Sequence, residues 1–245
     1  MKEGSLHFSH DQIRDIVAQK AWYGLDPQTG AFDWQASLNK LANQFSLSAD
    51  TLGPLITDCF TSDCLSRVKL EKNDQQTTVP LIQAISDLNI PFIVWTVGDC
   101  NWQKTKIQRT QTDQYIKKED GYVCASANKL EMLKTVLTKI SQNMPSENKI
   151  KVIVVDDKAE ILTKLMEEVA PVFSRQNIAI GNYHMKLNDP QADANAFYRW
   201  LQDQLQDNPS LYLVLDFDGV IADTNSVLFG PVVEKIFAAL NSNKV

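Results

Sequence analysis

The pattern of apolar and polar positions divides the chain into two parts, with a change near residue 77. Residues 1–76 carry apolar side chains at helical spacing and contain no convincing strand. From there on, short apolar runs alternate with amphipathic segments of helical period. This alternation is typical of a parallel sheet with crossover helices. The sequence therefore predicts a helical region over residues 1–76, followed by an α/β core over residues 77–225.

The helical region is expected to contain three amphipathic helices. One begins at Ser9 or Asp11 and runs to about residue 21, a second covers residues 34–45, and a third runs from Ser48 or Asp50 to residue 60. The polar segment of residues 69–77 can bury little, so we expect it to be a linker.

The core is expected to end in a central strand. Its elements, in chain order, are helix 79–88, strand 90–95, strand 121–126, helix 129–140, strand 152–155 with a helix behind it, strand 178–184, helix 191–206 and strand 211–215. The last strand is an uninterrupted apolar run, which suits a strand covered on both faces. Ligands of such sheets bind at the carboxyl ends of the strands, so polar residues that follow the strands are candidates for a site.

Two carboxylates follow the last strand, Asp216 and Asp218, and Gly219 then lets the chain turn. On an extended backbone both carboxylates point to one side, while Phe217 points to the other. Carboxylates this close repel each other unless a cation such as Mg2+ lies between them. One aspartate could then attack a phosphorus atom while the other serves the leaving group as general acid. The alternative is an ordinary strand end with an Asp-rich turn.

Two other strand ends carry candidate chemistry. Thr96 closes an apolar strand, and its hydroxyl could hold a phosphoryl oxygen together with backbone N–H groups at Val97 and Gly98. Asp156 and Asp157 end the run KVIVVDD, where adjacent acids are costly unless a cation or hydrogen-bond donors receive them. The alternatives are a structural threonine and a helix N-cap pair.

Lys129 stands at the start of an expected helix, where its ammonium could reach a dianion. Most lysines are solvated surface residues, which is the alternative for this one. Lys134, about one turn further along the same helix, is the second candidate for the role and is expected to face solvent.

These residues resemble the four motifs of the haloacid dehalogenase (HAD) superfamily. The first motif, D-x-D-G-[TV] followed by D-[ST], is matched by Asp216, Asp218, Gly219, Val220, Asp223 and Thr224. Thr96 is similar to the second motif, Lys129 to the third, and Asp156 with Asp157 to the fourth. Gln103, Lys106 and Ile107 are similar to the segment that often follows the second motif.

The order of these motifs is unusual. In most members of the superfamily they run I, II, III, IV, whereas here they run II, III, IV, I. The resemblance covers roughly residues 79–224 and implies a Rossmann-like three-layer core with a mainly parallel sheet, circularly permuted. The last strand would then lie in mid-sheet, beside the strands that carry Thr96 and Asp156. Residues 1–76, completed by 226–245 with a helix over 229–240, would form a helical cap. Alternatively, Asp216 begins a truncated second copy, and a neighbouring molecule completes the site.

The resemblance implies Mg2+-dependent hydrolysis of a small phosphomonoester. Asp216 would attack phosphorus, and Asp218 would protonate the leaving oxygen and later activate water. Thr96 and Lys129 would hold the phosphoryl group. Mg2+ would be bound by Asp216, the backbone carbonyl of Asp218 and Asp157, with Asp156 acting directly or through water. A phosphomutase uses the same parts, and a binding or regulatory protein that kept the fold without turnover is an alternative from a different class.

Composition narrows the partners. The chain has 245 residues, of which 44% are hydrophobic, enough for a sizeable core and a smaller appendage. A net charge of -6 argues against nucleic acid and anionic membrane surfaces, so a small phosphorylated substrate is expected. The N-terminus lacks an apolar secretion segment and no apolar run reaches membrane-spanning length, so we expect a cytoplasmic protein. We expect it to be a monomer or a homodimer. The four cysteines are expected to be reduced thiols.

Overall fold

The computed structural model describes the core and part of the N-terminal region. The described residues are 34–45, 69–73, 78–98, 100–116, 121–125, 128–142, 149–186, 188–207 and 210–222, with the single positions 24, 27, 48 and 50. Helix α2 (Trp34–Phe45) has the bounds that the sequence predicts. The helices expected over residues 9–21 and 229–240 lie outside the described residues, as do residues 51–60 of the third expected helix, Asp223 and Thr224.

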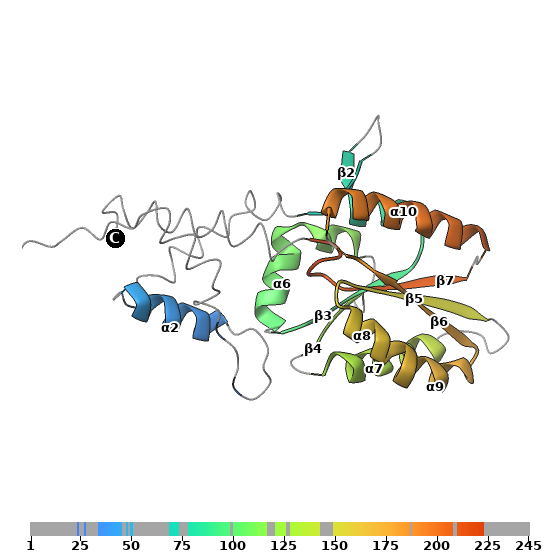
Figure 1. Cartoon of the computed structure of the whole chain (residues 1–245), viewed down its shortest axis with the longest axis horizontal. Helices are drawn as coiled ribbons and strands as arrows, with labels where there is room; N and C mark the ends of the chain where they lie inside the picture. The colour runs from blue at the N-terminus through green and yellow to red at the C-terminus, as the bar shows by residue number, and fades with distance from the viewer. Residues whose placement is uncertain are drawn as a thin grey trace, which may run out of the picture.

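One sheet of five parallel strands forms the centre of the core, in the order β4-β3-β7-β5-β6. Its strands are β3 (Phe92–Val97), β4 (Tyr122–Ala125), β5 (Ile150–Asp156), β6 (Ile178–His184) and β7 (Leu211–Leu215). The last strand of the described residues, β7, lies inside the sheet rather than at its edge (Figure 1). The predicted mid-sheet position of this strand, between β3 and β5, is confirmed.

The composition of β7 explains its central place. Leu213, Val214 and Leu215 are fully buried, because the strand is covered on both faces. Leu215 lies opposite Val94 of β3 on one side and Val155 of β5 on the other. The residues that follow these three strands therefore meet at one edge of the sheet.

Helices cover both faces of the sheet, which gives the three layers (Figure 1). On one face, α5 (Leu81–Asp87) and α10 (Pro190–Asp207) pack on one core cluster. On the other, α7 (Lys129–Gln142), α8 (Ala159–Lys164) and α9 (Ala170–Ser174) pack on a second, with a π-helical turn over Leu165–Val169. Alternate residues of β7 serve the two clusters: Leu213 and Leu215 the first, Val214 the second. The expected Rossmann-like α/β architecture is present.

The prediction of a linker over residues 69–77 is wrong for its first part. β1 (Glu71–Asn73) pairs antiparallel with β2 (Thr78–Pro80). The amide of Leu70 donates to the carbonyl of Ile221 at 3.0 Å, and the Leu70 side chain is buried. The average polarity of residues 69–77 does not reveal that one apolar residue, Leu70, is buried. In addition, the backbone hydrogen bonds of a strand pair do not require apolar side chains. The following helix, α5, accordingly begins at Leu81 rather than at residue 79.

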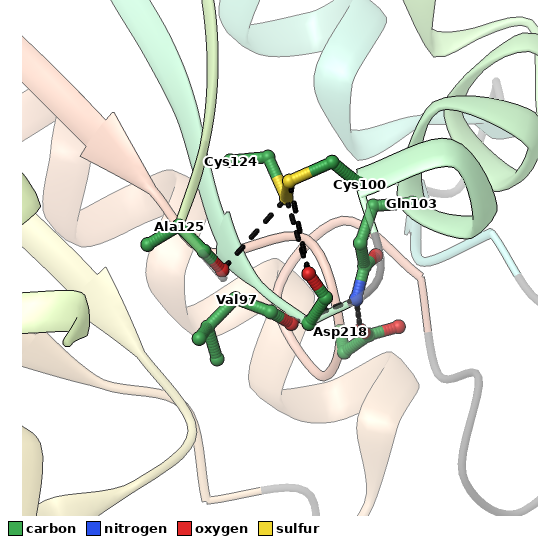
Figure 2. The surroundings of a disulfide bond; sticks show 7 residues. Val97, Cys100, Gln103, Cys124, Ala125 and Asp218 are labelled. Carbon is green, nitrogen blue, oxygen red and sulfur yellow. Dashed lines mark hydrogen bonds between the residues drawn. A yellow bond between two sulfur atoms is a disulfide. The ribbon is translucent and has the colours of Figure 1, made fainter. Parts of the chain in front are cut away.

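The prediction of reduced thiols is wrong for two of the four cysteines. Cys100, at the start of α6 (Cys100–Arg109), forms a disulfide with Cys124 of β4 (Figure 2). Their Cα atoms are 5.7 Å apart, within the range that a disulfide spans. Spacing along the sequence could not show this, because the contact depends on the pairing of β3 with β4. Cys59 and Cys64 lie outside the described residues.

Among the helices of the described segments, none has both the length and the apolar character that crossing a membrane requires.

Candidate active site and metal centre

Asp156 and Asp216 follow equivalent positions of neighbouring strands. Val155 lies opposite Leu215, and the amide of Asp216 donates to the Val155 carbonyl at 2.9 Å. Val155 and Leu215 face the cluster on the α10 side. Side chains alternate along a strand, so the next residue of each strand turns toward α7. Both aspartates are buried, with exposed fractions of 0% and 3%. The sheet thus brings the two carboxylates to the same side of its carboxyl edge.

The ammonium of Lys129 lies between these two carboxylates. Its Nζ is 2.7 Å from Asp156 Oδ2 and 2.6 Å from Asp216 Oδ2. Asn128 caps α7 by accepting a backbone N–H of its first turn at 3.1 Å, which fixes where Lys129 begins the helix. The Trp95 indole donates to the Lys129 carbonyl at 3.2 Å, and its ring lies 4.4 Å from Nζ. Three kinds of contact therefore fix Lys129: a hydrogen bond to its backbone carbonyl, a cation–π contact with the Trp95 ring and ion pairs with two carboxylates.

Asp157 packs against the glycine of the turn that follows β7. Gly219 has φ +84°, and a Cβ at this residue would lie 2.7 Å from the carboxyl carbon of Asp157. Only glycine combines this backbone conformation with so close an approach. Asp157 Oδ1 is buried and has no hydrogen-bond partner in the part of the chain that the structure describes. Burying a carboxylate oxygen without a donor costs free energy, and a bound cation or a hydrogen-bond donor at this oxygen would offset that cost.

Burial dominates the electrostatics of the cluster. It raises the pKa of Asp216 to about 7, with a further increase from Asp156 and Asp218 and an opposing effect of Lys129. Burial likewise raises the pKa of Asp157 to about 6, and repulsion from Asp156 adds to it. For Lys129, burial acts to lower the pKa, but the nearby carboxylates of Asp216 and Asp156 outweigh it, and the pKa is raised. The lysine therefore stays charged, while the carboxyl groups compete for one compensating cation.

The donor set of this cluster fits a hard divalent cation. Asp156, Asp157 and Asp216 each offer a carboxylate oxygen within 4.8 Å of the others. Carboxylate oxygens are the ligands that Mg2+ prefers. Asp157 carries the oxygen without another partner, whereas both oxygens of Asp156 accept hydrogen bonds, from Lys129 and from the backbone N–H of Lys158. Asp157 is therefore the stronger candidate ligand of the two, and Asp156 also supports the start of the segment that leads into α8.

Asp218 lies apart from this cluster and contacts α6. Both of its carboxylate oxygens are 2.6 Å from Lys106 Nζ, and Oδ2 also accepts from Gln103 Nε2 at 3.3 Å. Sequence reasoning noted Gln103 and Lys106 only through the resemblance and gave them no role. Residues three apart on a helix share a face, but this spacing does not show which distant residue the face contacts.

Thr96 is the residue before the last one of β3, opposite Cys124 of β4, and is 1% exposed. Gly98 has φ +130°, and Gln103 Nε2 donates to the Val97 carbonyl at 3.0 Å. The amide of Gly98 donates to the Ala125 carbonyl of β4 at 2.9 Å, so this N–H, expected to bind phosphate, is already engaged. The expected phosphate loop, Thr96 to Gly98, is thus tied to β4 and to α6.

Lys134, the second candidate for the lysine role, pairs with Glu131 at 2.6 Å on the exposed side of α7. It lies outside the cluster. The contacts of Lys129 with Asp156 and Asp216 form within one chain, so a neighbouring molecule is not needed to bring these residues together.

Comparison of the chain with protein-family models, with curated proteins and with solved structures finds no match.

Proposed function

We propose that the protein is a Mg2+-dependent phosphomonoesterase of the HAD superfamily with a circularly permuted motif order, acting on a small phosphorylated metabolite. The observation that carries the proposal is the shared ammonium of Lys129. It pairs with Asp156 and Asp216 next to Asp157, which has a buried oxygen without a donor among the described residues. A nucleophilic carboxylate, a compensating lysine and a carboxylate site for a cation are the parts that phosphoryl transfer through a covalent intermediate requires.

The residues of the candidate site have separate roles in the proposed reaction. An Asp216 oxygen attacks phosphorus, the bond from phosphorus to the leaving oxygen breaks, and that oxygen takes a proton from Asp218. Asp218 then takes a proton from water, whose oxygen attacks the aspartyl-phosphate and returns Asp216 as a carboxylate. Lys129 offsets negative charge beside the nucleophile, and Thr96 with the N–H group of Val97 receives phosphoryl oxygens. The N–H of Gly98 has no part in this step, because it donates to the Ala125 carbonyl at 2.9 Å.

Asp157, Asp216 and the backbone carbonyl of Asp218 would hold Mg2+, with Asp156 contributing directly or through water. When bound, the ion supplies positive charge that screens the anionic nucleophile and substrate from each other. The raised pKa values of Asp216 and Asp157 are consistent with a site built for additional positive charge.

Hydrolysis of an activated aryl phosphate, measured by release of the phenol, tests this function. We expect turnover with Mg2+, loss of turnover with a chelator, and loss in Asp216→Asn. Asp203→Asn, at an exposed position of α10, is the matched control and should retain turnover. Absence of turnover in the Mg2+-loaded wild type, or full turnover in Asp216→Asn, would contradict the proposal. Inorganic phosphate as the product separates a phosphatase from a phosphomutase.

A further inference from the structure

Two side chains of α6 hold the carboxyl group of Asp218. Lys106 Nζ contacts both of its oxygens at 2.6 Å, and Gln103 Nε2 contacts Oδ2 at 3.3 Å (Figure 2 shows the Gln103 contact). The Asp218 side chain is 26% exposed, whereas that of Lys106 is 6% exposed. A two-point contact with a buried partner restricts rotation of the carboxyl group, which a single surface contact would not do.

Lys106 is a buried lysine on a mostly polar helix, and burying an ammonium is costly unless it is paired. Its Nζ lies 5.5 Å from the centre of the Phe217 ring and 2.6 Å from Asp218 Oδ1. The Thr110 hydroxyl donates to the Lys106 carbonyl at 2.9 Å, and the next residue, Ile107, packs in the core. Lys104, two residues earlier, is exposed. The buried ammonium of Lys106 is thus paired with the carboxylate of Asp218.

Gln103 extends this contact to the loop after β3. The same Nε2 that reaches Asp218 also donates to the Val97 carbonyl at 3.0 Å. The turn after β7 and the expected phosphate loop are therefore both tied to one face of α6. The first residue of α6, Cys100, is in turn joined to β4 by the disulfide (Figure 2).

We propose that Lys106 is a positioning residue for Asp218, assisted by Gln103. It fixes the orientation from which Asp218 exchanges a proton with the leaving oxygen and with water. This inference rests on the proposed phosphatase function. Because Lys106 acts through Asp218 and does not bind the substrate, its removal should affect turnover and not substrate binding.

A displacement of about 1 Å at a reacting group costs on the order of 100-fold in rate. We therefore expect Lys106→Met to lower kcat by roughly 10- to 100-fold, with little change in KM. Lys106→Arg, which keeps the charge and a two-point contact, should recover most of the loss. The matched control is Lys104→Met, which removes an exposed lysine from the same helix and should leave kcat unchanged.

A double-mutant cycle with Asp218→Asn gives the decisive readout. If Lys106 acts through Asp218, the double variant Lys106→Met/Asp218→Asn should have the same kcat as Asp218→Asn alone. The double variant leaves neither charge without its partner, whereas Asp218→Asn alone leaves the ammonium of Lys106 unpaired. The Tm of each variant is therefore measured beside kcat, and kcat is compared at a temperature at which both are folded.

The outcomes separate this inference from the proposed function. Wild-type turnover that depends on Mg2+, with losses that do not add in the double variant, supports both. Turnover in the wild type with additive losses, with a raised KM in Lys106→Met, or with kcat equal to that of Lys104→Met overturns the positioning role alone. A wild type without turnover overturns the proposed function and the inference with it.

Discussion

Asp156 and Asp216 stand at the ends of adjacent parallel strands and share a single ammonium, that of Lys129, at 2.7 and 2.6 Å. The three residues come from β5, β7 and the start of α7, which are far apart in the sequence. Removal of a lysine that pairs with two buried carboxylates should cost more stability than removal of one that pairs with a single carboxylate, because two charges in the interior lose their counterion.

Lys129→Met should therefore destabilise the metal-free protein by roughly 3–5 kcal/mol above pH 7, where Asp216 is ionised. Lys134→Met is the matched control on the same helix, since it breaks a surface pair with Glu131 that contributes roughly 0–1 kcal/mol. Urea denaturation of both variants in the presence of a chelator measures the difference. Equal losses of unfolding free energy would contradict the buried role of Lys129.

The raised carboxyl pKa values predict how the metal-free stability depends on pH. Asp216 and Asp157 move from an ordinary value of 3.8 to about 7 and about 6 in the folded chain, mainly through burial. Between these values the folded protein binds more protons than the unfolded chain, so its stability falls as pH rises. This contribution is fully present below pH 3.8 and is lost as pH passes through about 6 and then about 7.

Denaturation of the wild type and of Asp157→Asn in chelator, at intervals from about pH 4 to pH 8, isolates the contribution of Asp157. The free energy of unfolding of the wild type should fall more steeply with pH than that of the variant. Saturating Mg2+ should reverse this, because the ion binds the deprotonated carboxylates. Parallel curves in chelator would show that Asp157 titrates as it does in the unfolded chain.

Gly219 is expected to be irreplaceable for both stability and metal binding. An alanine there would adopt φ +84° and place its Cβ 2.7 Å from the Asp157 carboxyl carbon. Gly219→Ala should therefore cost on the order of 1–3 kcal/mol and weaken Mg2+ binding by displacing Asp157. Gly181→Ala on β6 is the control, since a Cβ there would meet side chains at 3.8 Å, an ordinary contact. Titration of each variant with Mg2+ by calorimetry measures the affinity. An unchanged affinity in Gly219→Ala would show that the turn at Gly219 does not affect Mg2+ binding by Asp157.

The disulfide should stabilise the fold by restricting the unfolded chain. Cys100 and Cys124 are 24 residues apart, and closing a loop of this size contributes about 3 kcal/mol. A reductant should lower the Tm of the wild type and leave that of Cys100→Ser/Cys124→Ser unchanged. A wild-type Tm that does not respond to the reductant would show that the bridge contributes nothing in solution.

Much of the sheet could be predicted from the sequence because its strands are apolar runs with sharp ends. β6 and β7 have the predicted bounds, and α7 begins at Lys129 as expected. The central place of β7 followed from its uninterrupted apolar run and from the motif order.

The contributions of α6 and the disulfide could not be predicted in the same way. Gln103 and Lys106 are each 5% exposed, yet hydrophobic periodicity takes polar side chains as solvated. Their burial depends on Asp218, which lies far along the chain, and the disulfide depends likewise on strand pairing. Contacts between distant residues of these kinds leave no local signature.

The most direct test of the account is covalent trapping at Asp216. The Mg2+-loaded protein is mixed with an activated aryl phosphate, quenched in acid within the first turnovers, and digested for peptide mass spectrometry. The account predicts the mass of one phosphoryl group on the peptide that carries Asp216, and its absence in Asp216→Asn. Turnover of the phosphate ester with no phosphorylated peptide, or with the phosphoryl group on another residue, would contradict it.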